Sequence, residues 1–176
     1  MKEYYAGTLA GLKITATPLM VWASLGLWAV MTIIALLLNL NFGQALVAGL
    51  ICVILHWISE FVHQLGHAWL ARRTGYPMIG IRFGTHILFA TALYPPDEPT
   101  LPAATHLQRA FGGPVASGAM TVIAFIVLLV VQPSSALWHF VAWFFFLENL
   151  LVFTLQALIP LGFNDGSTIL HYWRQR

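Results

Sequence analysis

Two long stretches of the chain contain no charged residue. No Asp, Glu, Lys or Arg occurs between Lys13 and Glu60, and a second such stretch runs from Ala110 to Leu147. A helix that crosses a bilayer needs about 20 mostly apolar residues, so each stretch is long enough for two spans. Turn-forming residues divide the stretches at 39–44 and 132–135. The pattern therefore predicts four spanning helices, near 18–39, 45–70, 113–131 and 136–160.

In the connection between the second and third predicted spans, apolar residues alternate with other residues. Ile79, Ile81 and Phe83 alternate with Gly80 and Arg82, and a second alternating run covers 87–93. Alternation with a period of two is typical of β-strands, so we expect strands within 78–94. Because free strand edges are not tolerated in lipid, these strands must lie at the membrane interface or against protein.

The composition agrees with a chain that lies in a lipid bilayer. Of the 176 residues, 59% are hydrophobic and 8% are charged, whereas soluble domains carry about 25% charged residues. We therefore expect an all-α polytopic membrane protein with one short interfacial β-strand segment, organised as a single membrane domain over 1–176. The net charge is only +2, and the basic residues do not cluster into a patch that could bind nucleic acid. Nucleic-acid binding is therefore set aside.

The positions of the basic residues predict the orientation in the membrane. Four spans put both termini on one side, and every Lys and Arg falls on that side: Lys2, Lys13, Arg72, Arg73, Arg82, Arg109, Arg174 and Arg176. Loops rich in Lys and Arg stay on the cytoplasmic side. We therefore expect both termini and the 71–110 connection to be cytoplasmic.

A pair of histidines near the cytoplasmic end of the second predicted span marks a candidate metal site. His63 and His67 are four residues apart, so their imidazoles share one helix face and can hold one ion. Asp165 offers a third ligand at similar depth, because Pro160 and Gly162 interrupt the fourth span before it. This set leaves the fourth position of a zinc ion open, as hydrolysis requires. The alternatives are histidines that only hydrogen-bond within the bundle and an Asp that only forms a turn.

These two segments together resemble the site-2 protease family of intramembrane zinc metalloproteases. The family has a His-Glu-x-x-His helix and a later Asn-x-x-Pro-x-x-x-x-Asp-Gly segment, and Pro160, Asp165 and Gly166 match the second spacing. The stretch from Phe111 to Ser117 is similar to the family's Gly-Pro-x-Ala-Asn element, with Ser117 in the Asn place. The resemblance covers roughly residues 45–170, and the strands that follow the histidine helix also fit it.

The resemblance implies zinc as the cofactor, with His63, His67 and Asp165 as its ligands. The substrate would be a transmembrane protein or peptide, hydrolysed at a peptide bond in or near its membrane span. The substrate helix must first unwind, and a strand edge near 79–93 could then hold it extended by strand addition.

Gln64 departs from the family at the catalytic position. The family's glutamate there is the general base, and a carboxamide cannot accept and pass on a proton at neutral pH. We therefore expect zinc binding with weak or absent hydrolysis. Gln64 is either natural, giving a pseudoprotease, or an engineered replacement of glutamate. Ala157 also stands where the family has Asn, with Gln156 adjacent to take its place.

Glu60 and Glu148 are further carboxylates inside the predicted spans. Glu60 shares the helix face of His63 and His67, and Glu148 lies at a similar depth, so the two carboxylates could meet across the bundle. We interpret them as structural hydrogen-bonding groups, and His56 as a packing residue. The alternatives are a partner of a zinc histidine, a substitute proton acceptor or part of a cation path.

Three functions stay open at this point. The first is an intramembrane zinc endopeptidase or an inactivated form of one. The second is a non-enzymatic membrane protein that keeps the fold and binds transmembrane partners. The third, a small cation or proton transporter, is least favoured because the sequence has no paired inverted repeat.

Overall fold

The computed structural model describes residues 2–131 and 135–175, which form mainly long helices. Four helical segments are long and apolar enough to cross a membrane. They are α1 (Pro18–Leu37), α2 (Phe42–Arg73), α3 (Ala103–Val131), and α4 (Ala136–Leu147) continued by the π-helix η1 (Glu148–Gln156). The predicted multi-pass membrane architecture is thereby confirmed, although α3 begins ten residues earlier than expected. The predicted break at 132–135 lies mostly outside the described residues.

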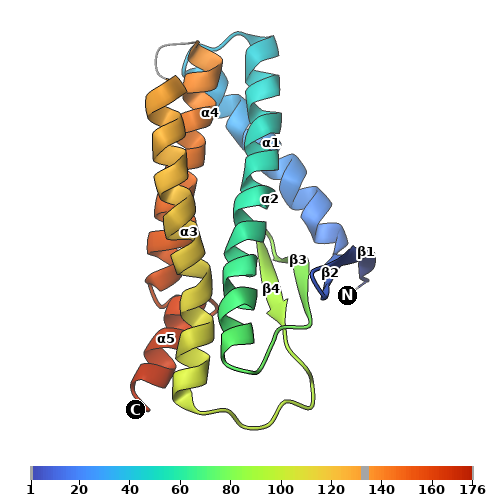
Figure 1. The fold of residues 1–176 in the computed structure, drawn as a ribbon. Helices are drawn as coiled ribbons and strands as arrows, with labels where there is room; N and C mark the ends of the chain where they lie inside the picture. Colours follow the sequence, from blue (N-terminus) through green and yellow to red (C-terminus); the bar gives the residue numbers. More distant parts are fainter. Residues whose placement is uncertain (1, 132–134, 176) are drawn as a thin grey trace.

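The fold is mostly helical and strands form within 78–94 as expected, but these strands belong to a larger, four-stranded mixed sheet (Figure 1). An N-terminal hairpin of β1 (Tyr4–Leu9) and β2 (Leu12–Ala16) pairs in parallel with β3 (Gly80–His86). β3 in turn pairs antiparallel with β4 (Phe89–Leu93). The sequence did not reveal the hairpin because the buried positions of β2, Leu12 and Thr15, do not alternate.

Local signals set the turn between α1 and α2. Asn39 has a φ of 66°, in the left-handed region that Asn adopts more readily than most residues. Asn41 then caps α2 in a reciprocal capping box with Gln44: the Asn41 side chain accepts from the Gln44 N–H, and the Gln44 side chain accepts from the Asn41 N–H. The turn-forming residues read from the sequence therefore end one span and begin the next.

The backbones of α2 and α3 touch where both helices carry glycine. A Cβ on Gly66 would lie 2.2 Å from the carbonyl oxygen of Gly112, and one on Gly112 would lie 2.4 Å from that of Gly66. Membrane helices approach closely where small residues face each other. This contact brings the histidine face of α2 directly against α3.

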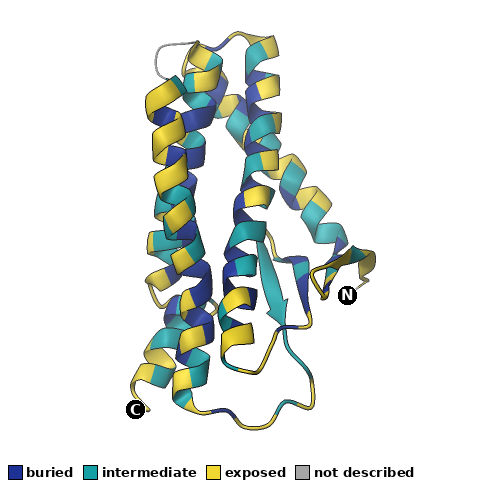
Figure 2. Cartoon of the chain, in the orientation of Figure 1, coloured by how far each residue is buried: buried dark blue, intermediate teal, exposed yellow. Residues whose placement is uncertain are grey.

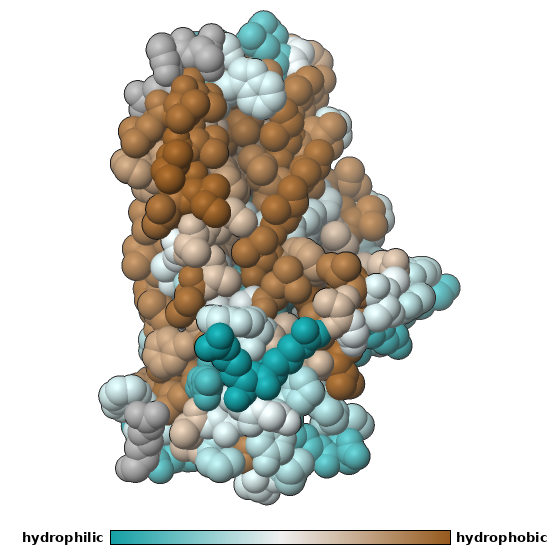
Figure 3. Space-filling model, in the orientation of Figure 1, coloured by the Kyte–Doolittle hydropathy of each residue, from teal (hydrophilic) through white to brown (hydrophobic). Residues whose placement is uncertain are grey.

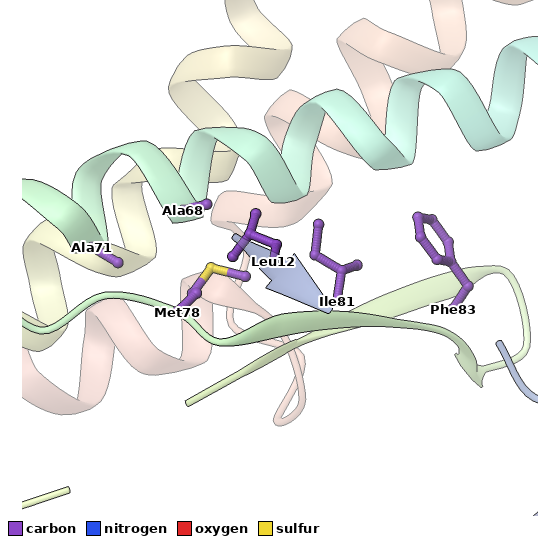
Figure 4. Close-up of a cluster of buried hydrophobic side chains, with 6 residues drawn as sticks. All are labelled: Leu12, Ala68, Ala71, Met78, Ile81 and Phe83. Atoms are coloured by element: carbon purple, nitrogen blue, oxygen red, sulfur yellow. The ribbon is translucent and has the colours of Figure 1, made fainter. Parts of the chain in front are cut away.

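A cluster of buried apolar side chains fastens the sheet to the same half of α2. Leu12 from β2, Ile81 and Phe83 from β3, and Met78 just before β3 point toward α2, which contributes Ala68 and Ala71 (Figure 4). Burial of this apolar surface holds the sheet beside the helix. The strands therefore lie against protein, as the membrane argument required.

The outer faces of the helices are exposed and apolar. Figure 2 shows exposed residues along the outside of the bundle, and Figure 3 shows these surfaces to be hydrophobic over α1 to α4. Hydrophilic side chains gather at the end that carries the sheet and both termini (Figures 1 and 3). An apolar exterior of this kind fits a lipid environment. That the polar end faces the cytoplasm stays a prediction.

We expect Gly66→Ala to destabilise the protein, because the new methyl group must push the α3 backbone away. Overpacking of this kind lowers the free energy of unfolding by about 1–3 kcal/mol. Gly26→Ala in α1 is the matched control, since its Cβ would meet nothing within 4 Å. Thermal unfolding in detergent should show a lower midpoint for Gly66→Ala than for Gly26→Ala. Equal midpoints would contradict the tight helix contact.

Candidate metal centre

Three side chains with metal-ligand atoms meet at the polar end of the bundle. His63 and His67 come from α2, and Asp165 is the first residue of α5 (Asp165–Trp173). The two Nε2 atoms are 3.1 Å apart. Asp165 places Oδ2 3.1 Å from His63 Nε2 and Oδ1 3.3 Å from His67 Nε2. Zinc bonds of ~2.0–2.1 Å in a tetrahedral site give ligand separations of roughly 3.3 Å, so this triangle fits such an ion.

The hydrogen bonds behind the histidines favour a cation between the three groups. His67 Nδ1 lies 2.8 Å from the carbonyl oxygen of Arg109, which can only accept, so Nδ1 carries the hydrogen. The Gly113 N–H makes a longer contact of 3.3 Å with the same nitrogen. The Nε2 lone pair of a neutral His67 therefore faces the Asp165 carboxylate. A metal ion resolves this repulsion, and ligating histidines commonly bond a carbonyl in this way.

The same segment of α3 supports His63 and leaves room for an ion. Ser117 Oγ lies 2.9 Å from His63 Nδ1. A Cβ on Gly113 would lie only 2.3 Å from His63 Nε2 and 2.4 Å from His67 Nε2. Glycine therefore keeps free a space that is within metal-bonding distance of both nitrogens. The donor set and this space both fit a zinc-sized ion.

Asn164, which the sequence reasoning missed, positions Asp165. Its Nδ2 donates to the carbonyl oxygens of Gln156 at 3.0 Å and Ile159 at 2.6 Å, and its Oδ1 accepts from the Ser167 N–H at 3.3 Å. One side chain thus ties the end of η1 to the first turn of α5. An Asn directly before an acidic first turn is a helix-capping signal, so the sequence did contain a clue.

A cavity of about 350 Å³ lies beside the three candidate ligands. Gln64 lines it, and the Gln64 amide donates to Glu60 Oε1 at 3.0 Å and to the Ala90 carbonyl at 3.3 Å. The Ala90 N–H donates to the same Glu60 oxygen at 2.7 Å. An added strand would need these two Ala90 groups. The outer edge of β4 is therefore occupied at Ala90, which limits the expected strand addition to its other positions.

Arg109 ties the proline-rich segment 94–102 to the candidate site. Its guanidinium donates to both carboxylate oxygens of Glu98, at 2.9 and 2.5 Å, and lies 4.1 Å from the centre of the Tyr94 ring. The hydrogen bonds from Arg109 hold the pKa of Glu98 below its usual value, and burial raises the pKa of Tyr94 to about 12. Because the Arg109 carbonyl also bonds His67, one residue links this segment to a candidate ligand.

The other buried carboxylates take separate partners. Glu148 Oε1 lies 2.7 Å from His56 Nδ1, and His56 Nε2 lies 2.8 Å from the Leu88 carbonyl oxygen. Glu60 bonds Gln64 and Ala90 instead. No hydrogen bond joins Glu60 to Glu148 within the described residues, so the suggested meeting of the two is not observed.

The comparisons with known proteins give a likeness of fold. No protein-family model matches the sequence, and no curated protein matches it. Among solved structures, the site-2 protease from Methanocaldococcus jannaschii is similar, with a TM-score of 0.65 and 18% sequence identity. The match covers 99% of this chain and 72% of that chain. The chain therefore has a site-2-protease-like fold, as the sequence resemblance indicated.

Removal of a candidate ligand should abolish stoichiometric metal binding. We expect His67→Ala and Asp165→Ala each to lose zinc, because two remaining ligands hold an ion weakly. His139→Ala is the control, since His139 lies on α4, is half-buried and accepts a hydrogen bond from the Trp143 ring N–H instead of contacting the candidate ligands. Elemental analysis of the purified proteins measures the metal. Full zinc in both ligand variants would show that the site is misassigned.

Asn164→Ala should weaken metal binding without removing a ligand. Loss of a group that orients a ligand typically costs about 10–100-fold in metal affinity. Asn41→Ala removes a helix cap at the opposite end of α2 and serves as a control of similar stability cost, about 0.5–2 kcal/mol. Competition with a zinc chelator gives the affinities. Equal affinities for the two variants would leave Asn164 with only a structural role.

Proposed function

We propose that this chain is a site-2-protease-like intramembrane zinc metalloendopeptidase that acts on membrane-spanning proteins, and that Gln64 makes its hydrolysis weak. The observation that carries the proposal is the triangle of ligand atoms from His63, His67 and Asp165 beside a cavity. The similar fold of a known site-2 protease supports it.

The residues fit a hydrolytic zinc site. Two imidazoles and one carboxylate would hold the ion and leave a position open toward the cavity. When bound, zinc supplies a Lewis acid that polarises a carbonyl group and makes water a nucleophile near neutral pH. The Arg109 carbonyl and the Ser117 hydroxyl fix the two imidazole rings, so the ligands are preorganised.

The size of the cavity beside the candidate ligands supports a short, extended peptide as the substrate. Its volume of about 350 Å³ lies at the low end of ligand pockets, which range over roughly 300–1,000 Å³. A helix with its side chains is about 10–12 Å wide, so a spanning substrate would unwind before it enters. β4 lines one wall from Phe89 to Ala92, and Phe153 adds an apolar surface.

Binding without cleavage is the second candidate function, and one observation favours it. The Gln64 amide donates to both Glu60 and the Ala90 carbonyl, which an ionised glutamate at this position could not do. Gln64 therefore fits its surroundings as a donor. A membrane protein that binds such peptides and seldom cuts them would use the same cavity.

Gln64→Glu should create or raise peptide cleavage while the zinc content stays the same. General-base catalysis contributes about 10²- to 10⁴-fold, so the gain should be easy to detect. The assay follows cleavage of a transmembrane substrate in liposomes, with a zinc chelator as a control for metal dependence. Gln44→Glu makes the same chemical change at the far end of α2 and should have no effect.

Two results would redirect this proposal. A Gln64→Glu protein that binds zinc but cleaves none of a broad substrate panel would favour the binding function. Rapid cleavage by the unmodified chain would show that position 64 does not supply the base.

A further inference from the structure

Three carboxylates line the cavity, and only one of them is free to take up a proton. Asp165 faces both histidines, and both oxygens of Glu98 accept hydrogen bonds from Arg109. Glu60 uses Oε1 for both of its hydrogen bonds. Its other oxygen, Oε2, makes no hydrogen bond with the described residues. Glu60 therefore has one carboxylate oxygen without a hydrogen-bond partner among the described residues, in the wall of the cavity.

Gln64 and β4 fix the position of this carboxylate. The Ala90 N–H lies 2.7 Å and the Gln64 Nε2 lies 3.0 Å from Glu60 Oε1, so both partners donate. The opposite orientation of the Gln64 amide would place its oxygen against two other oxygen atoms, those of Glu60 and Ala90. The hydrogen bonds therefore determine the amide orientation. Glu60 is held by donors alone, which suits an acceptor.

The remaining membrane-embedded carboxylate is placed elsewhere. Glu148 bonds His56 and lines a second, apolar cavity of about 470 Å³, but not the cavity beside the histidines. On α2, residues 60, 63, 64 and 67 share one helix face, because they are spaced by three and four. Glu60 thus lies one turn from Gln64, on the side of the helix that carries the candidate ligands.

We propose that Glu60 is the weaker proton acceptor behind the slow hydrolysis of the unmodified chain and that the Gln64 amide positions it; a carboxylate introduced at position 64 would take over this role. The inference rests on the proposed hydrolytic function. Glu60 takes one proton from a water molecule, and the oxygen of that water bonds to the carbonyl carbon of the peptide. The carbon–nitrogen bond then breaks, and the proton moves from Glu60 to the leaving nitrogen. The products are a carboxylic acid and an amine, so the atoms balance without an oxidant or reductant.

Acetohydroxamic acid provides a test that does not depend on cleavage. A hydroxamic acid binds zinc as its anion, so its proton must pass to a base in the site, to hydroxide displaced from the ion, or to the buffer, and the comparison with the Glu60 variant separates the first of these from the second. The zinc-loaded protein is titrated with acetohydroxamic acid in a calorimeter, in two buffers of different ionisation enthalpy. The difference between the two binding enthalpies gives the number of protons released to the buffer for each molecule bound. The unmodified chain should release almost none because Glu60 takes the proton, whereas Glu60→Gln should release a full proton. Glu148→Gln is the matched control and should behave like the unmodified chain.

Cleavage kinetics give the second measurement. Glu60→Gln should lower the slow cleavage by the unmodified chain by about 10²- to 10⁴-fold, with zinc content and unfolding midpoint retained. Release of a full proton by the unmodified chain, or equal cleavage by Glu60→Gln, would overturn the role of Glu60. Glu60→Ala takes the place of Glu60→Gln in the calorimetric comparison if Glu60→Gln does not fold. Failure of the zinc-loaded chain to bind the hydroxamic acid would instead count against an open metal position, and so against the proposed function.

Discussion

The polar face of α2 has to find partners inside a bundle that is otherwise apolar, and the rest of the fold supplies most of them. His56, Glu60, His63, Gln64 and His67 lie along this face and are all buried. Unpaired polar groups are costly in a membrane interior. α3 contributes a carbonyl and a hydroxyl, η1 a carboxylate, β4 two backbone groups and α5 an aspartate. The candidate metal centre is the part of this network where three ligand atoms converge.

The same network explains how a β-sheet can lie beside membrane helices. β4 is an edge strand, and open edges do not occur in lipid. The side chains of Glu60 and Gln64 pair with the N–H and carbonyl of Ala90 much as a neighbouring strand would. His56 pairs with the carbonyl of Leu88, in the turn just before β4. Helix α2 therefore both carries the candidate ligands and closes part of the sheet edge that borders the cavity.

The long uncharged stretches and the local spacing of a few residues were sufficient to predict much of this architecture. Uncharged stretches predicted the four spans, and the spacing of His63 and His67 with Asp165 predicted a cluster that the structure brings together. The hairpin β1–β2 was not predictable, because β2 is defined by its parallel pairing with a strand that follows two helices. The His56–Glu148 pair likewise joins residues 92 positions apart, which no helical period reveals.

We propose that His63, His67 and Asp165 together hold one zinc ion inside the membrane domain. X-ray absorption at the zinc edge of the purified, zinc-loaded protein tests this directly. We expect a four-coordinate ion with two imidazole nitrogens and oxygen ligands at about 2.0–2.2 Å, and loss of this signature in His63→Ala. A spectrum of fully hydrated zinc, or one with no imidazole contribution, would contradict it.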